Sequence, residues 1–262
     1  MSLTHDQLHH FAHALMDAGE AHMPISPLTD ELPELSPEDA YGIAADIIGH
    51  KMGDGRHIVG RKVGVTSEAA QKALGIDTPS FGIILDDMTV RDGGRVRMSN
   101  LIQPKIEAEI GFRLREGLKG PGVTADDVIA ATEYVFPALE IVDSRIVDWK
   151  VKRGDLIADN TASAMVVLGN THIAPGDIDL AAEQVSLTID GREIASGEGS
   201  AVLGHPANAI AWLANTLGEM GMGIGAGEFV IPGSMVAPQV VRAGNAITAA
   251  YGSLGIVSVS FV

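Results

Sequence analysis

The chain has 262 residues, 46% of them hydrophobic, which is enough to bury one substantial core. Its formal net charge is -16, and it lacks the clusters of Lys and Arg that bind a phosphate backbone, which argues against a nucleic-acid partner. Because it has no cysteine, disulfides, thiolate metal sites and cysteine nucleophiles are excluded.

Residues 1–20 do not have the character of a signal peptide. Polar residues and four histidines interrupt the apolar core that such a peptide needs. No apolar run in the chain approaches the roughly 18 to 20 residues that span a bilayer. We therefore expect a soluble, cytoplasmic protein with no membrane partner.

Two helices are predicted near the N-terminus. Apolar residues recur at helical spacing over 4–19, and a Pro-containing stretch, 24–33, follows as a linker. Ser36 stands before a proline in the pattern of a helix N-cap, which predicts a second helix that ends near Met52. We expect residues 1–55 to form a helical region packed on the core.

Residues 56–262 are predicted to form a β-rich catalytic core in one structural unit. Short β-rich runs bounded by Gly, Asp and Asn predict strands at 57–65, 95–98, 105–114, 134–142, 164–168, 185–189 and 247–262. Asp190 and Gly191 are typical of a two-residue hairpin turn, and His205 is predicted to cap a helix that runs through Leu217. The pattern indicates an α+β fold, with a mixed, mostly antiparallel β-roll or barrel and helices outside it.

The segment 104–112 alternates strictly between apolar and polar residues. As a strand it places its apolar side chains on one face and Lys105, Glu107 and Glu109 on the other. As a helix it would separate the two glutamates by about 200°, so the strand is the coherent interpretation. The two carboxylates then lie roughly 7 Å apart at Cα. The alternative is an amphipathic strand whose polar face meets water.

Glu140 lies within the otherwise apolar run 136–142, where an unpaired carboxylate would be costly. Three carboxylates that converged would repel one another unless a cation lay among them. Ligation by oxygen atoms with open water positions suits Mg²⁺ or Mn²⁺ better than Zn²⁺. The alternative is that Glu140 pairs with Arg145 or another basic residue.

Six motifs follow one another between residues 59 and 261: VGRKVGVTS (59–67), QPKIEAEIGF (103–112), PALEIVDSRIVDW (137–149), IADNTAS (157–163), GSAVLGHPANAIAWLA (199–214) and GSLGIVSVSF (252–261). Together they resemble the 2-keto-4-pentenoate hydratase and 4-oxalocrotonate decarboxylase family, which is related to the fumarylacetoacetate hydrolase superfamily. The resemblance runs from about residue 40 to the end. It implies a mixed β-roll or barrel surrounded by helices, like the C-terminal part of fumarylacetoacetate hydrolase.

The resemblance also implies site residues and a reaction. The metal triad of the family falls on Glu107, Glu109 and Glu140, and the family lysine falls on Lys62 as a catalytic residue. The bound ion would be Mg²⁺ or Mn²⁺, and Lys62 would move protons or bind the substrate carboxylate. The favoured activity is that of a hydro-lyase of aromatic meta-cleavage catabolism. It would add water to 2-hydroxypenta-2,4-dienoate (2-keto-4-pentenoate) and give 4-hydroxy-2-oxopentanoate.

The substrate pocket is expected to include Ser80, Asp159, Asn160 and Ser163. The Asp-Asn pair matches an Ala-Asp-Asn motif of the family, although turn formation explains the same two residues equally well. Ser80 stands where hydratases of the family often carry aspartate in a Pro-Asp-Phe/Tyr-Gly turn. The usual Thr-Gly near the end is Pro-Gly-Ser at 232–234, which removes one hydroxyl and one backbone donor. These departures leave the metal site complete and alter the organic half of the pocket.

Three other functions stay open. A decarboxylase for 2-oxohex-3-enedioate (4-oxalocrotonate) would use the same chelation and release CO₂, and a basic residue for the second carboxylate would favour it. An acylpyruvate-type hydrolase would need an acid–base pair such as His-Glu, which no histidine segment suggests. The chain could also be a catalytically silent partner subunit. The resemblance implies a homo-oligomer, and a complex with a downstream aldolase or a related decarboxylase is a further expectation.

Overall fold

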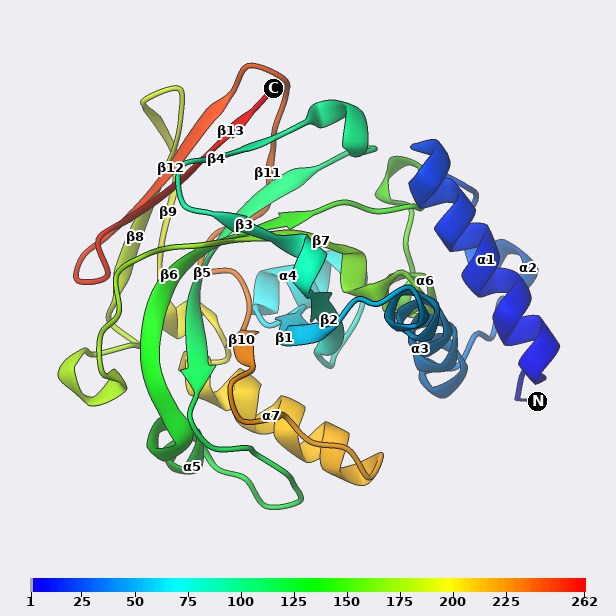
Figure 1. Cartoon of the computed structure of the whole chain (residues 1–262), viewed down its shortest axis with the longest axis horizontal. Coiled ribbons are helices and arrows are strands. Elements are labelled where there is room, and N and C mark those ends of the chain that lie inside the picture. The colour runs from blue at the N-terminus through cyan, green and yellow to red at the C-terminus, as the bar shows by residue number, and fades with distance from the viewer. Residues whose placement is uncertain (1) are drawn as a thin grey trace.

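Two β-sheets form the body of the molecule, and helices lie outside them (Figure 1). The structure, a computed structural model, describes residues 2–262. The strands are β1 (Ile58–Gly64), β2 (Ser80–Leu85), β3 (Thr89–Arg91), β4 (Gly94–Val96), β5 (Lys105–Leu114), β6 (Thr132–Val142), β7 (Ser163–Leu168), β8 (Gln184–Ile189), β9 (Arg192–Glu198), β10 (Phe229–Ile231), β11 (Gln239–Val240), β12 (Ala246–Tyr251) and β13 (Ile256–Phe261). The helices are α1 (His5–Ala21), α2 (Leu28–Glu31), α3 (Pro37–Gly53), α4 (Glu68–Leu74), α5 (Ala125–Ala131), α6 (Arg153–Ala158) and α7 (Pro206–Glu219).

Both sheets are mixed. The larger one has the strand order β2-β1-β10-β5-β6-β7-β3, with β11 paired to β5, and the smaller one has the order β4-β13-β12-β8-β9. Within residues 2–262, the pairs β1–β10, β4–β13 and β3–β7 are parallel, and the other strand pairs are antiparallel. The predicted α+β class, with a mixed and mostly antiparallel sheet and helices outside it, is confirmed.

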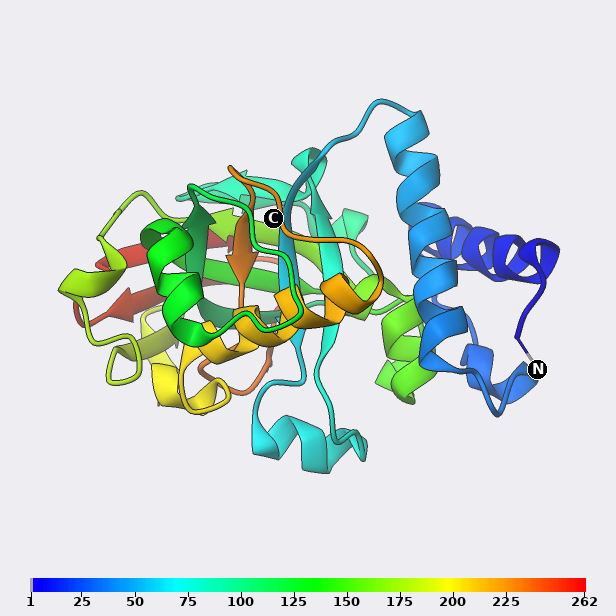
Figure 2. The ribbon, with the colours of Figure 1, turned by 90° about the horizontal axis from the view of Figure 1, so that it is seen from below.

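The helices α1, α2 and α3 lie to one side of the sheets (Figures 1 and 2). Thr4 and Ser36 cap α1 and α3, each accepting a hydrogen bond from the backbone three residues later, and the cap at Ser36 is the one that the sequence predicts. The two helices share one buried apolar cluster, to which they contribute Phe11, Leu15, Ile43 and Ile47. The first two predicted helices are therefore confirmed.

The predicted linker 24–33 is partly wrong, because it contains the one-turn helix α2. Thr29 of this helix donates its backbone N–H and its hydroxyl to the carboxylate of Asp155, at 2.9 and 2.7 Å. Asp155 is buried at a position 126 residues further along the chain. The order of this segment thus comes from a tertiary contact that local sequence patterns do not show.

The long antiparallel pair β5 and β6 is buried on both faces. Ile106 and Ile110 point into the main core, as the alternation predicts. Glu109 on the opposite face is 0% exposed, so the alternative of a solvent-exposed polar face is wrong for this residue. Tyr251 of β12 donates its hydroxyl to the backbone oxygens of Glu109 and Ala138, at 2.7 and 3.0 Å, and so fixes the smaller sheet on this pair.

Two local predictions in the second half of the chain are confirmed. Asp190 and Gly191 form the turn between β8 and β9 with φ of 52° and 77°, the left-handed geometry that such a hairpin needs. His205 caps α7, because its Nδ1 accepts the N–H of Ala207 at 3.1 Å. None of the helices within residues 2–262 is long and apolar enough to cross a membrane.

Candidate metal centre

Adjacent positions on β5 and β6 bring three carboxylates together. Glu107 stands directly opposite Glu140 in the antiparallel register, and Glu109 follows two residues later on the same face of β5. One carboxylate oxygen from each of the three lies within 4.8 Å of the others. Glu109 and Glu140 are 0% exposed, and Glu107 is half-buried. The three glutamates that the sequence singles out therefore form one group.

Lys62 on β1 supplies a positive charge to this group. Its Nζ lies 3.1 Å from Glu140 Oε2 and donates a hydrogen bond to the backbone oxygen of Thr161 at 3.1 Å. Arg145 does not reach Glu140, because it forms an ion pair with Asp159. The alternative of a Glu140–Arg145 pair is thus wrong, and the partner of Glu140 is Lys62.

The electrostatics of the group favour an additional cation. Burial raises the pKa of Glu107 to about 8, with the Glu140 charge adding to the effect, and the same causes raise the pKa of Glu109 well above its ordinary value. Burial acts to lower the pKa of Lys62, but the charges of Glu140, Glu107 and Glu109 outweigh it, so the pKa is raised and the ammonium stays charged. One ammonium therefore faces three carboxylates.

The oxygen atoms of the group also have unused bonding capacity. Glu109 Oε1 and Glu140 Oε1 are buried and have no hydrogen-bond partner in the described part of the chain, whereas Glu140 Oε2 faces the Lys62 ammonium. Buried carboxylate oxygens without donors are costly unless a cation or ordered water meets them. Three carboxylates at this spacing are the oxygen ligands that Mg²⁺, Mn²⁺ or Ca²⁺ takes in proteins, so the residues fit a divalent ion.

Gly233, which the sequence did not single out, holds Glu109 in place. Its N–H donates to Glu109 Oε2 at 2.7 Å, so the loop keeps this donor although Pro232 has no N–H of its own. Gly233 has φ +122°, and a Cβ at this position would lie 1.9 Å from Thr66 Oγ1. Only glycine fits both the conformation and the space. A glycine directly after an apolar strand and a proline was the signal available in the sequence.

The turn Asn160–Ala162 directs a backbone oxygen at Lys62. Its three residues have consecutive positive φ of 51°, 52° and 55°, a left-handed conformation that is unfavourable for the β-branched Thr161. Asn160 offsets this cost by bonding both the N–H and the oxygen of Ile83 on β2, at 2.8 and 2.9 Å. The Thr161 hydroxyl donates to the oxygen of Phe81 at 2.7 Å, which leaves the Thr161 oxygen free for Lys62.

Ser80, predicted to line the substrate pocket, lies close to Lys62. It pairs with Gly64 across β1 and β2, and a Cβ on Gly64 would lie 3.4 Å from Lys62 Nζ and 3.6 Å from Ser80 Oγ. The Ser80 hydroxyl is buried and unpartnered within residues 2–262. Lys62 Nζ and Ser80 Oγ therefore border the same space over Gly64.

The other three predicted pocket residues line a separate cavity, although Asn160 also lies beside Lys62, since a Cβ on Gly82 would lie 3.1 Å from both Asn160 Oδ1 and Lys62 Cγ. Asp159, Asn160 and Ser163 line a cavity of about 440 Å³ whose lining includes neither Lys62 nor the three glutamates. The carboxylate of Asp159 is occupied by Arg145 and by the hydroxyl of Ser144. Buried carboxylate oxygens without a hydrogen-bond partner lie in the glutamate group, and among residues 2–262 the lining of this cavity has none. We therefore take the three glutamates as the candidate metal centre.

The chain matches the fumarylacetoacetate hydrolase C-terminal family over residues 53–262. The chain belongs to this family. It is 44% identical over 239 residues to the 2-hydroxyhexa-2,4-dienoate hydratase of Comamonas testosteroni, covering 90% of each chain. It is 39% identical over 259 residues to the 2-keto-4-pentenoate hydratase of Paraburkholderia xenovorans, covering 99% of this chain and 96% of the relative.

Among solved structures of the family, the chain is similar to the 4-oxalocrotonate decarboxylase from Pseudomonas putida G7 in complex with magnesium and adipate. The two share 38% identity with a TM-score of 0.97, covering 100% of this chain and 99% of that one. The predicted family and the predicted fold are therefore confirmed. Both kinds of activity that the sequence suggested, hydratase and decarboxylase, occur among these relatives.

Proposed function

We propose that the chain is a metal-dependent hydratase of a 2-hydroxyalka-2,4-dienoate in aromatic catabolism, with 2-hydroxypenta-2,4-dienoate as the simplest substrate. The observation that carries the proposal is the buried Lys62–Glu140 pair beside Glu107 and Glu109. The names of two relatives, at 44% and 39% identity, support the choice of a hydratase. The product from the five-carbon substrate would be 4-hydroxy-2-oxopentanoate.

The three glutamates and Lys62 have different roles in the proposed reaction. A divalent ion such as Mg²⁺ or Mn²⁺, held by Glu107, Glu109 and Glu140, would supply electrostatic stabilisation for the C1 carboxylate and the C2 oxygen of the substrate. The supporting residues are rigid: the backbone donor of Gly233 fixes Glu109, and the register of β5 and β6 fixes the other two carboxylates.

Lys62 is suited to handle the protons of the reaction. Hydration transfers the C2 hydroxyl proton to C5, which gives an unsaturated 2-oxo acid, and then adds the oxygen of water to C4 and a proton to C3. An ammonium has three N–H donors; one bonds Thr161 and one faces Glu140, so one remains for the substrate. Lys62 would hold a proton at Nζ and exchange it with the C2 oxygen or with carbon.

One observation favours decarboxylation as a second candidate function. Lys105 lies on the same face of β5 as Glu107, and its Nζ lies 4.0 Å from the centre of the Trp149 ring. A second substrate carboxylate could bind this cation. The similar decarboxylase structure holds adipate, which is a dicarboxylate. The corresponding reaction would release CO₂ from 2-oxohex-3-enedioate.

An assay of the purified protein alone with Mg²⁺ distinguishes the hydratase from the decarboxylase. We expect the absorbance of enzymatically generated 2-hydroxypenta-2,4-dienoate to decay with formation of 4-hydroxy-2-oxopentanoate, and EDTA to stop the decay. Release of CO₂ from 2-oxohex-3-enedioate without turnover of the dienoate would favour the decarboxylase. A matched Lys105→Gln variant should lose activity only on the dicarboxylate. Failure to turn over either substrate with or without metal would refute the enzyme and leave a silent partner subunit.

A further inference from the structure

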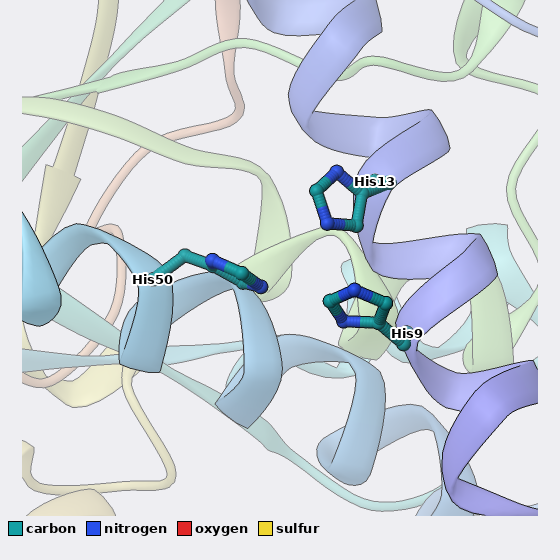
Figure 3. A group of neighbouring side chains, drawn as sticks. All are labelled: His9, His13 and His50. Carbon is teal, nitrogen blue, oxygen red and sulfur yellow. The ribbon is translucent and has the colours of Figure 1, made fainter.

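Three histidines meet between two N-terminal helices, far along the chain from the carboxylate group. His9 and His13 lie one turn apart on α1, and His50 lies in the last turn of α3 (Figure 3). One ring nitrogen from each lies within 4.8 Å of the others. The ring centres are 4.3 Å apart for His9 and His13, 5.2 Å for His9 and His50, and 5.0 Å for His13 and His50.

We propose that His9, His13 and His50 form a second metal site, specific for a divalent transition ion of the Zn²⁺ class. Two histidines at i and i+4 project from the same face of a helix, which is a common arrangement of ligands for such ions. Imidazole nitrogen suits Zn²⁺, Cu²⁺ and Ni²⁺, whereas Mg²⁺ and Ca²⁺ take oxygen ligands. The two sites of the molecule therefore differ in the ions they select.

Asp46 orients the imidazole of His9 for this role. It lies one turn before His50 on α3, and its Oδ2 is 2.9 Å from His9 Nδ1 and 4.0 Å from His50 Nε2. When His9 donates its Nδ1–H to this carboxylate, its Nε2 carries the lone pair that a metal needs. Carboxylates bonded to metal-binding histidines fix the ring and the tautomer in this way, and the negative charge offsets that of the ion.

Ions in solution can reach the site, and the two helices that carry it pack on a shared buried apolar cluster. The side chains of His9 and His50 are 45% and 37% exposed. Beneath them, the buried apolar cluster that α1 and α3 share sets the distance between the helices. On a tetrahedral Zn²⁺ the ligand nitrogens lie roughly 3.3 Å apart, so the present separations, which are within 4.8 Å, would have to shorten by up to about 1.5 Å through rotation of the rings.

A bound ion would join α1 to α3 and stabilise the N-terminal helical region. The alternative is that the rings only pack against one another, without a metal. The two differ in one property, because ring packing gives no dependence of stability on Zn²⁺, whereas a bound ion raises the unfolding temperature further as the Zn²⁺ concentration rises above the dissociation constant.

The test titrates ZnCl₂ into the full chain by calorimetry and by thermal unfolding, with excess Mg²⁺ present to occupy the carboxylate group. We expect one Zn²⁺ site in the wild type whose affinity falls at least tenfold in His13→Ala and in His50→Ala. His10→Ala, which removes an exposed histidine of α1 outside the cluster, is the matched control and should bind Zn²⁺ like the wild type. In thermal unfolding, His13→Ala and His50→Ala should lose the rise in unfolding temperature that Zn²⁺ causes in the wild type.

Two results would overturn the proposal. One is the absence of Zn²⁺ binding in the wild type under these conditions. The other is Zn²⁺ binding of equal strength in the wild type, His13→Ala and His50→Ala, which would place the ion at the carboxylates instead. Circular dichroism of each variant, compared with His10→Ala, establishes that the helices are intact.

Discussion

The behaviour of the carboxylate group depends on one lysine. Lys62 is the ammonium that contacts Glu140, and a single positive charge does not balance Glu107 and Glu109 as well. The same charge that stabilises the metal-free group competes with a bound cation. Removal of Lys62 should therefore slow turnover but leave metal binding equal or stronger.

Replacing Lys62 with Met tests this division. We expect kcat to fall by about 10² to 10⁴, the usual contribution of a positioned acid or base, because the N–H donor is lost. The affinity for Mg²⁺ should stay equal or increase, because a competing positive charge is removed. Calorimetry and steady-state kinetics measure the two effects, and Lys150→Met, which changes an exposed lysine, is the control. A variant that kept full kcat would remove Lys62 from the mechanism.

Gly233→Ala tests the backbone support of Glu109. The added Cβ collides with Thr66 and takes a left-handed conformation that costs about 1 to 3 kcal/mol of the free energy of unfolding. Displacement of the Gly233 N–H from Glu109 should also weaken Mg²⁺ binding. Urea unfolding and metal titration measure both. Gly176→Ala is the control, because a Cβ there meets no heavy atom within 4 Å among residues 2–262; equal stability of the two variants would contradict the assignment.

The residues of the group differ in how far sequence could reveal them. Glu107 and Glu109 follow from the alternation of one strand, and Glu140 follows from its apolar surroundings. Gly233 and Thr161 contribute through backbone atoms; the glycine itself was the signal for Gly233, whereas no sequence pattern marks the backbone oxygen of Thr161. Assignment of the metal, catalytic and substrate-binding roles stays a prediction until it is measured.

At the level of secondary structure, the left-handed turn 160–162 connects β2 to the lysine. Asn160 is both a residue that tolerates this conformation and the one that bonds the backbone of Ile83. The turn therefore has a structural reason for its Asn, separate from the pocket role that the sequence suggested. Its function would be to position Thr161 and, through it, Lys62.

Asn160→Ala should reduce stability and turnover together. The loss of two hydrogen bonds leaves buried backbone groups unpaired, at about 1 to 3 kcal/mol for each group. Because the Thr161 oxygen would shift from Lys62, kcat should fall with little change in KM. Asn170→Ala, at an exposed asparagine, is the control for both measurements. A normal kcat in a destabilised Asn160→Ala protein would limit the turn to a structural role.

Long strands were predictable, whereas several short elements were not. β5 and β6 were located within about two residues because the alternation of polar and apolar residues in β5 and the apolar run in β6 extend over most of each strand. β10 and β11 have three and two residues, and they exist because β5 and β1 pair with them. Pairing between distant segments is a tertiary property, so local patterns could not show these strands.

For the whole molecule, the raised pKa of Glu107 predicts how the metal-free protein responds to pH. Because its pKa of about 8 in the fold exceeds the ordinary 4.5, the folded state binds the extra proton. This contribution to stability is complete below about pH 4.5 and is lost as the pH rises through about 8, with a slope of at most about 1.4 kcal/mol per pH unit for one proton.

Urea unfolding in EDTA from pH 5 to pH 9 measures this effect. The wild type should lose stability relative to Glu107→Gln as the pH rises, and Mg²⁺ should reverse the loss because the ion binds the ionised carboxylates. Parallel pH profiles of the two proteins without metal would contradict the prediction.

Three predictions concern the whole molecule. They are the division into residues 1–55 and 56–262, the homo-oligomer, and the complex with an aldolase or related decarboxylase. Sedimentation of the purified chain, alone and mixed with a candidate partner, measures the assembly.

The most direct measurement of the central claim is a crystal structure of the protein soaked in Mn²⁺, with anomalous scattering used to locate the ion. We predict one strong peak bound by carboxylate oxygens of Glu107, Glu109 and Glu140, which disappears in an active-site variant such as Glu140→Gln. An active, Mn²⁺-dependent enzyme whose anomalous peak lies away from these three residues would contradict the account.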